Sequence, residues 1–209
     1  MAKKKIRQTR CGGEQLRAVG DSRRVEGYAI VFDTWSDNLG FREIIRPESL
    51  DEDILKASDI FALLNHDKSR GVLARSKKMS EDASLELHID EKGLFYAFDA
   101  PNTPLGDELL ENIRRGEIDS SSFCFTVKEE KWSKDEAGNY SHEILRFDKL
   151  YDVSPVYTAA YEATSVDLRG RDELDEELAE AERREAEELE RLQAIKESQD
   201  RLDALYRRY

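Results

Sequence analysis

The sequence predicts an α+β fold in which short strands form a small β-rich barrel or a sandwich, with a few helices and a long C-terminal helix. Short apolar or alternating segments, typical of strands, fill the middle of the chain. One well-delimited helix interrupts them, and strand–helix–strand repetition typical of a doubly wound parallel sheet is missing. Residues 171–209 instead show helical periodicity without glycine or proline.

The strand signals are strongest in four segments. Residues 84–90 alternate apolar and polar side chains, and the apolar run at 94–98 follows a turn at 91–93, which predicts a hairpin. Residues 28–32 form a short apolar run, as expected of a buried strand. Residues 120–127 alternate again: one face carries Phe123, Phe125 and Val127, and the other carries Ser122, Cys124 and Thr126.

Helix signals delimit one segment inside this β-rich region. Thr103 is a suitable N-cap, Pro104 suits the first helical position, and Gly116 suits the end. The apolar stripe of this predicted helix consists of Leu105, Leu109, Leu110 and Ile113.

Charge is distributed unevenly along the 209 residues, of which 39% are hydrophobic and 38% charged. Residues 1–24 carry a net charge of +6, residues 25–170 of −13 and residues 171–209 of −6. We therefore expect a basic flexible leader in 1–24, a folded domain in 25–170 and an acidic amphipathic helix in 171–209. The overall charge of −13 argues against a mainly nucleic-acid-binding surface.

The tail has a leucine-rich helical pattern that is interrupted. Glu185 and Glu188 stand where a strict heptad repeat requires apolar residues, so coiled-coil pairing and a solvated single helix both remain open. The apolar positions are Leu174, Leu178, Ala181, Leu189, Leu192, Ile195, Leu202 and Leu205.

Several kinds of chemistry lack support in the sequence. Cys11 and Cys124 form no CxxC pair, and the three histidines are dispersed, so no metal site is expected. No glycine-rich nucleotide loop occurs, so no cofactor is expected. The sequence has neither a membrane-spanning apolar run nor a secretory signal behind its basic start. Catalysis by a side-chain nucleophile is the chemistry left to consider.

The residues for such a nucleophile and its base are few. His66 follows a buried apolar run in LLNHD, where an ordinary surface-loop histidine is the commoner case and a catalytic base is the alternative. The nucleophile candidates are Ser120, Ser121, Ser122 and Cys124. Ser122 projects opposite the buried phenylalanines of its strand, as a nucleophile should, although composition alone favours a polar strand edge. Only Lys128 is near enough in sequence to activate the thiol of Cys124.

The remaining titratable candidates have simpler explanations. Asp148 and Asp152 stand in a mostly apolar strand, where a carboxylate needs a partner such as a histidine or Arg146. His88 is expected to face solvent from an alternating strand, and His142 is expected to be exposed after the linker-like residues 135–141.

Four blocks of the sequence, taken in order, resemble a known family. They are GYAIVFDTWSDNLGFREIIRPESL, FALLNHDKSRGVLARS, GLFYAFDAPNTPLGDELLENIRRGEIDSSSFCFTV and DVSPVYTAAYEAT, within residues 25–166. In this order the chain resembles the prohead proteases of tailed bacteriophages, which are similar to the herpesvirus assemblins. HD followed by VLAR, and the serine strand preceded by a helix and RRGEI, carry most of the resemblance.

The resemblance implies a serine endopeptidase whose catalytic residues fall on His66, Ser122 and Asp152. In the family the serine usually lies in a Met-Ser-Phe-Gly-Phe-like strand, and here Ser121 replaces the Met and Cys124 the Gly, which leaves Ser121 as an alternative. The acidic member, often in a Glu-Val-Ser phrase, falls on the Asp-Val-Ser at 152–154. The assemblins use a second histidine instead, so the alternatives for this role are His142, His88, Glu143 and Asp148.

The resemblance also implies partners and a location. The substrates would be the phage scaffold and major capsid protein precursors, with the enzyme itself as a further target, inside the immature prohead in the host cytoplasm. No nucleic acid or membrane partner is expected. The tail at 171–209 lies outside the resemblance, and our separate hypothesis is that it docks scaffold or capsid protein or forms a homo-oligomer. Two alternatives are a catalytically inactive assembly module that binds capsid protein through its C-terminal helix, and a cysteine hydrolase using Cys124 with His66.

Overall fold

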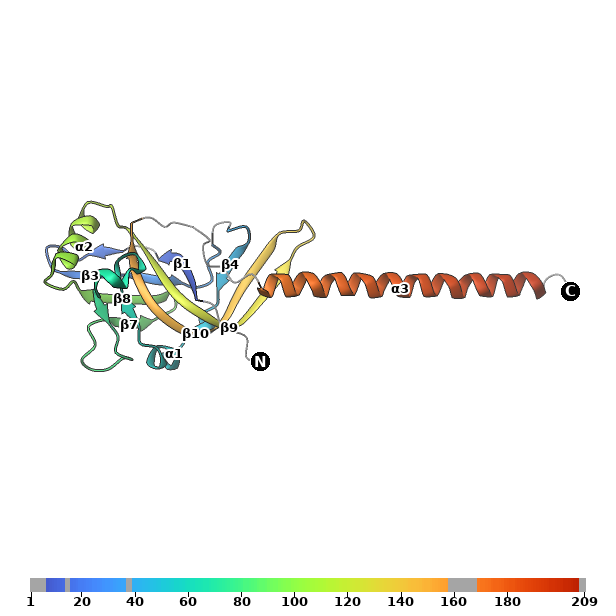
Figure 1. Cartoon of the computed structure of the whole chain (residues 1–209), viewed down its shortest axis with the longest axis horizontal. Helices are drawn as coiled ribbons and strands as arrows, with labels where there is room; N and C mark the ends of the chain where they lie inside the picture. Colours follow the sequence, from blue (N-terminus) through green and yellow to red (C-terminus); the bar gives the residue numbers. More distant parts are fainter. Residues whose placement is uncertain (1–6, 14–15, 37–38, 158–168, 207–209) are drawn as a thin grey trace. The chain divides into compact units, whose positions relative to one another are not determined.

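The chain consists of a sheet-containing unit and a helical unit. The computed structural model describes residues 7–13, 16–36, 39–157 and 169–206, and its contacts divide the chain into Met1–Asp167 and Leu168–Tyr209. The first unit contains two β-sheets and short helices, and the second contains one long helix (Figure 1). The predicted α+β class is thereby confirmed.

The larger sheet has six strands and is centred on two long antiparallel ones. Their 15 and 17 residues far exceed the predicted segment at 120–127, and β10 also pairs in parallel with β4 and β5. The spatial order is β1 (Gln8–Gly13), β9 (Ser120–Lys134), β10 (Tyr140–Val156), β5 (Phe61–Ala62) and β6 (Ala74–Arg75), with β4 (Arg42–Ile45) also on β10.

The smaller sheet is wholly antiparallel and contains the predicted hairpin. Its order is β2 (Arg17–Ala18), β3 (Arg24–Val31), β8 (Gly93–Asp99) and β7 (Glu86–Ile89). Gly93 begins β8 where the backbones crowd, since a Cβ atom there would lie 1.9 Å from the carbonyl oxygen of Ile30.

The described strands form two sheets and no closed barrel, so of the two predicted alternatives the barrel is corrected. Alternation and hairpin turns are local signals that barrels and packed sheets share. Closure depends on which distant strands share hydrogen bonds, and a single sequence does not specify that pairing.

One hydrophobic core joins the two sheets. Its largest fully buried side chains include Tyr96 and Phe98 from β8, Phe123 and Phe125 from β9, and Phe147 from β10. The rings of Phe125 and Phe147 meet edge to face with centroids 4.9 Å apart. Because Phe123 and Phe125 are packed in this core, the alternate side chains of β9 are held on the opposite face.

The short helices cover the ends of this core. In α2 (Pro104–Arg114), the Thr103 side chain accepts a hydrogen bond from the Gly106 N–H, which confirms the predicted helix and its N-cap. The other helices of this unit are α1 (Glu52–Ala57) and the 3-10 turns η1 (Pro47–Ser49), η2 (Leu64–His66) and η3 (Lys68–Arg70).

Part of the basic leader is structured. Gln8–Gly13 form β1 on the edge of the larger sheet, and Arg17–Ala18 form β2, whereas residues 1–6 lie outside the described part of the chain. The side chain of Arg10 explains why a polar strand is held there: it is 7% exposed and its guanidinium makes two hydrogen bonds to Glu43. This ion pair holds β1 on the sheet. The strand therefore lacks the alternating apolar side chains from which strands are predicted.

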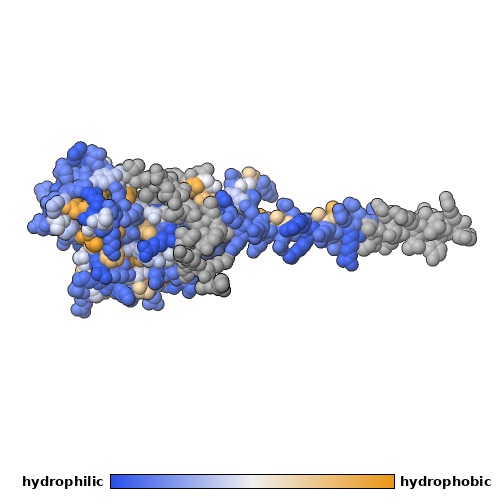
Figure 2. All heavy atoms as spheres, in the orientation of Figure 1, coloured by the Kyte–Doolittle hydropathy of each residue, from blue (hydrophilic) through white to orange (hydrophobic). Residues whose placement is uncertain are grey.

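The second unit is the helix α3 (Arg169–Tyr206), as the periodicity of the tail predicted. Figure 2 shows a mostly hydrophilic surface on its described part, with a few apolar side chains between the charged ones. Leu178, Leu189 and Leu192 are 41%, 57% and 54% exposed. Arg184 pairs with Glu180 four residues earlier, as in a solvated helix.

Candidate active site

Three segments far apart in the sequence bring a histidine, a serine and an aspartate into contact. The Nε2 atom of His66 lies 2.6 Å from the Oγ atom of Ser122, and its Nδ1 atom lies 2.5 Å from Oδ1 of Asp152. The imidazole therefore bridges a hydroxyl and a carboxylate, which is the arrangement of a nucleophile, a base and the group that orients the base.

The central strands place the serine and the aspartate on one face of the sheet. In the β9–β10 register, Ser122 lies opposite Ser154 and Cys124 lies opposite Asp152. Side chains alternate along each strand, so these four residues share a face. Their neighbours Phe123 and Val153 are buried in the core, and this packing fixes the direction in which Ser122 and Asp152 project.

The histidine reaches this face because β5 runs beside β10. Phe61 lies opposite Asp152, and the chain then turns through η2 to His66. Asn65 and His66 have φ angles of 52° and 59°, which are uncommon for residues other than glycine and cost about 1–3 kcal/mol each. The Asn65 side chain accepts a hydrogen bond from the Tyr157 N–H at 3.2 Å, which ties this turn to the end of β10.

Strand β1 pairs with β9 on the edge opposite β10 and contacts the nucleophile there. Ser122 is 1% exposed, and its Oγ atom lies 2.9 Å from the carbonyl oxygen of Arg10. A hydroxyl has one proton, so Ser122 donates either to His66 or to this carbonyl at any moment. When His66 is protonated and donates to Ser122, the Arg10 carbonyl is the acceptor that remains for the hydroxyl.

The structure separates the neighbouring serines of β9 from one another. Ser121 is fully buried on the core side, where its Oγ atom lies 2.8 Å from the Tyr96 hydroxyl. Ser120 donates its hydroxyl to Asp119. Of these three serines, Ser122 is therefore the one in contact with His66. Because neighbouring side chains of a strand lie on opposite faces, Ser121 points into the core instead.

The surroundings of Cys124 disfavour a thiolate. Burial and the negative charge of Asp152 raise the pKa of its thiol to about 11, which outweighs opposing effects of Thr9 and Arg7. A reactive cysteine requires the opposite shift. The structure therefore disfavours a cysteine hydrolase that uses Cys124, because its thiol is not activated.

The other candidates for the acidic position have partners elsewhere. Glu143 accepts hydrogen bonds from Arg46, and Asp148 accepts one from the Thr126 hydroxyl at 3.3 Å. His88 is exposed on β7 of the smaller sheet. Asp152 alone among the five proposed candidates is in hydrogen-bond contact with His66 in the described structure.

His142 was expected to be exposed, and this expectation is wrong. It is 0% exposed, stacks on Trp132 with ring centroids 4.2 Å apart, and contacts both Glu43 and Glu130 at 2.8 Å. Residues 135–139 are the turn of the β9–β10 hairpin rather than a linker, so His142 stands inside a strand flanked by β4 and β9.

The network around His142 is a buried cluster of charges that sequence patterns did not reveal. Burial opposes the charge on His142, but hydrogen bonds to Glu130 and Glu43 prevail and raise its pKa. Burial likewise opposes the charge on Glu43, but Arg10 and His142 prevail and lower its pKa. This network anchors β1, whose Arg10 carbonyl contacts the Ser122 hydroxyl.

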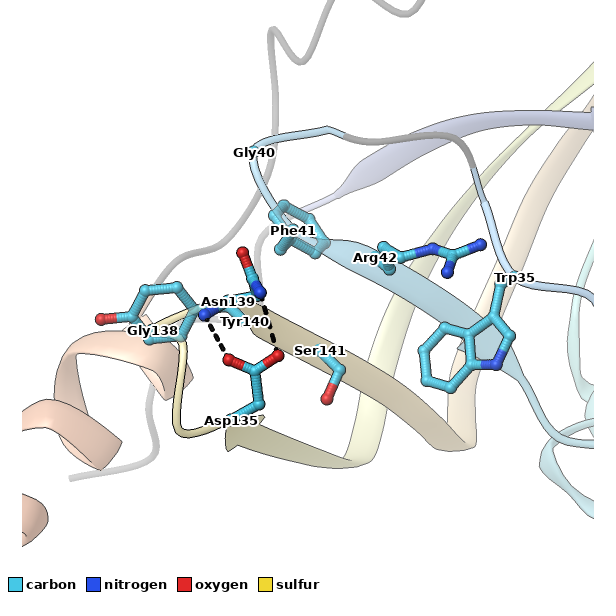
Figure 3. A pocket seen from close by; sticks show the side chains of 9 residues that line it. All are labelled: Trp35, Gly40, Phe41, Arg42, Asp135, Gly138, Asn139, Tyr140 and Ser141. Atoms are coloured by element: carbon cyan, nitrogen blue, oxygen red, sulfur yellow. Dashed lines mark hydrogen bonds between the residues drawn. The ribbon is translucent and has the colours of Figure 1, made fainter.

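A cavity of about 710 Å³ lies at the β9–β10 turn (Figure 3). It is not lined by the triad of His66, Ser122 and Asp152. It is lined by Trp35, by residues 40–42 and by residues of the turn, where Asn139 donates two hydrogen bonds to Asp135. Among the described residues, no cluster of three or more metal-ligating side chains occurs. No described helix is long and apolar enough to cross a membrane.

Comparison with known proteins gives one family match and one structural likeness of note. Residues 14–177 match the family described as Caudovirus prohead serine protease. The bacteriophage T4 capsid assembly protease, gp21, is similar in structure at 14% sequence identity, with a TM-score of 0.47 over 73% of this chain and 99% of that chain. No curated protein matches the sequence.

Proposed function

The chain belongs to the caudovirus prohead serine protease family, and from this membership we propose that it is a serine endopeptidase of phage head maturation. Its substrates are the phage scaffold and major capsid protein precursors, and its own chain is a further target. It acts inside the immature prohead in the host cytoplasm. The observation that carries the proposal is the position of His66 between Ser122 and Asp152.

The proposed mechanism assigns one role to each residue. His66 removes the proton from the Ser122 hydroxyl as Oγ attacks the scissile carbonyl carbon, and the same imidazole then protonates the leaving amine. Asp152 accepts the hydrogen bond from Nδ1, which leaves Nε2 free to act as the base and stabilises the imidazolium that forms. Water, activated by His66, hydrolyses the acyl-enzyme.

The other segments are proposed to support this activity. The protease domain is proposed to consist of residues 25–170 together with the leader strands β1 and β2, which pair with its sheets. The acidic helix that follows docks scaffold or capsid protein through its exposed leucines or pairs with a second copy. Deletion of 171–209 tests this role, because protease lacking the tail should still react at Ser122 but enter proheads less efficiently. Unchanged incorporation into proheads would argue against docking.

The decisive experiment is labelling of the purified full-length chain with a fluorophosphonate, followed by mass spectrometry of the labelled peptide. Wild-type protein should be modified on Ser122, whereas Ser122→Ala and His66→Ala should remain unmodified. Ser120→Ala is a matched control in the same strand, because its hydroxyl contacts Asp119 and not His66. Absence of labelling in folded wild-type protein would instead favour the inactive assembly module.

Substrate identity needs a separate measurement. Co-expression with the cognate capsid precursor, with wild type compared against Ser122→Ala, should give truncated capsid protein only with wild type. The masses of the products locate the cleavage sites, and any shortened form of the protease itself would reveal self-cleavage. Uncleaved precursor in the presence of labelled, active protease would refute the proposed substrate while leaving the protease activity intact.

A further inference from the structure

Ser154 is a second serine that faces the triad, from strand β10. It is 0% exposed, and its Oγ atom donates a hydrogen bond to Oδ1 of Asp152 at 2.7 Å. It lies two residues after Asp152 and opposite Ser122 in the strand register. The three side chains therefore project from the same face of the sheet.

The carboxylate oxygen that contacts His66 is the one that Ser154 also contacts. Oδ1 of Asp152 is 2.5 Å from Nδ1 of His66 and 2.7 Å from Oγ of Ser154. The terminal torsion of an aspartate is broad, so a single hydrogen bond to a mobile imidazole does not fix the plane of the carboxylate. A second donor from the rigid strand restricts that rotation.

The hydroxyl also matters because Asp152 is buried. A buried carboxylate requires hydrogen-bond donors, and Asp152 is the group that stabilises the imidazolium of His66. Asp152 is itself only 7% exposed, so little water is available to replace this donor. Loss of the hydroxyl would leave the carboxylate both freer and less well solvated.

Comparison with other buried serines sets Ser154 apart. Ser58 and Ser76 accept hydrogen bonds from the backbone N–H groups of Leu150 and Ile60, and Ser121 contacts Tyr96. These contacts join different segments of the fold to one another. The hydroxyl of Ser154 contacts the triad carboxylate instead, on its own strand.

We propose that Ser154 is a positioning residue of the active site, which acts through Asp152 by holding its carboxylate in the plane that orients His66. The inference rests on the proposed protease function. It extends the hydrogen-bonded chain to four residues: Ser154, Asp152, His66 and Ser122. Ser154 does not touch the reacting atoms, so its effect must pass through the carboxylate.

The test is a double-mutant cycle on the full-length chain, read as the rate of Ser122 labelling by a fluorophosphonate. Ser154→Ala should slow labelling by about tenfold, as expected for loss of one hydrogen bond to a charged group. In the Asp152→Ala background the same substitution should change the rate by less than about twofold, because the group through which it acts is gone. Ser154→Thr, which keeps the hydroxyl, should restore part of the rate.

Matched controls separate positioning from folding. Ser76→Ala removes an equally buried hydroxyl outside the triad and should leave the labelling rate unchanged, while thermal unfolding shows that each variant is folded. Equal slowing by Ser154→Ala with and without Asp152 would overturn the inference, as would an unchanged rate in Ser154→Ala. Wild-type protein that fails to label at Ser122 would contradict the protease function itself, which is a different outcome.

Discussion

The Nε2 atom of His66 lies 2.6 Å from the Oγ atom of Ser122, although 56 residues separate them in the sequence. Two features of the fold produce this contact. Strand β5 runs parallel to β10 and delivers the chain beside Asp152, and the left-handed backbone at Asn65 and His66 turns the imidazole toward β9. Because the contact joins a base to a hydroxyl, it should behave as one functional unit.

His66→Ala and Ser122→Ala should each abolish labelling and peptide cleavage. Residues that act as a unit are non-additive, so the double variant should be no less active than either single variant. Each substitution removes atoms without adding bulk, so circular dichroism and thermal unfolding should remain close to wild type. Cleavage at the wild-type rate by either purified variant would refute the assignment.

Asp152→Asn should lower the rate of reaction at Ser122 by on the order of 10³–10⁴, with little change in shape. The amide that replaces the carboxylate carries no negative charge, and it favours the wrong tautomer of His66 by offering a donor to Nδ1. Single-turnover labelling of Ser122 measures this loss directly. Glu143→Gln is the control, because that carboxylate pairs with Arg46, and its labelling rate should match wild type.

Iodoacetamide should not inactivate the enzyme near neutral pH. With its pKa raised to about 11, the Cys124 thiol is ionised in fewer than about one molecule in a thousand at pH 7.5. Activity remaining after prolonged treatment, with mass spectrometry to follow Cys124, checks the expectation. Inactivation that tracks alkylation of Cys124, and that persists in Ser122→Ala, would restore the cysteine alternative.

Arg10→Met should destabilise the protein by about 3–5 kcal/mol, because it leaves the buried carboxylate of Glu43 without its strongest partner. The double variant Arg10→Met/Glu43→Gln should recover part of this loss, since the uncompensated charge is then absent. Urea unfolding followed by fluorescence measures both. Equal stability of the single and double variants would show that the ion pair does not act as a pair.

The buried histidine predicts how stability depends on pH. The pKa of His142 is raised in the folded state, despite its burial, by hydrogen bonds to Glu130 and Glu43. Its contribution is therefore complete below the ordinary histidine pKa of about 6.5, and it is lost as the pH rises through the folded value. The free energy of unfolding should fall over that window in wild type.

The matched variant for this prediction is His142→Gln, which keeps hydrogen-bonding groups without a titratable charge. Its free energy of unfolding should be lower than that of wild type near pH 6 and should change less as the pH rises above 6.5. Glu43 has the opposite pH dependence. Its pKa is lowered in the folded state, so its contribution to the free energy of unfolding is lost as the pH falls through that lowered value. Parallel pH profiles for wild type and His142→Gln would contradict the assignment.

Local patterns predicted the elements that depend on local physics. The cap at Thr103, the hairpin of 84–98 and the long C-terminal helix follow from propensity, turn chemistry and periodicity, and the structure contains all of them. Alternation in 120–127 also separated Ser122 from Ser121, because the two side chains of neighbouring residues must lie on opposite faces of a strand.

Hydrophobic patterns in the sequence did not predict strands held by polar contacts, nor the pairing of strands that lie far apart in the sequence. Residues 1–24 show no hydrophobic periodicity, which predicts a flexible leader, yet Gln8 and Arg10 are buried in β1. There the Arg10 guanidinium donates hydrogen bonds to Glu43 and to the Gln8 side chain. His142 was read as exposed because the hairpin turn before it resembles a linker. Barrel and sandwich could not be told apart, because they differ in strand partners that only the fold specifies.

The amino-acid sequence by itself therefore determined which residue types were available for catalysis and the face of the strand from which the serine projects, because both follow from chemistry within a few residues. The resemblance assigned the acidic role to Asp152 but left His142, His88, Glu143 and Asp148 as alternatives. Only the tertiary structure brings Asp152, and none of those four, into contact with the imidazole, and places Ser154 and Arg10 beside the site. These contacts depend on the pairing of β5, β9, β10 and β1 over long sequence separations. Such pairing is set by the packing of the whole core and leaves no local signature.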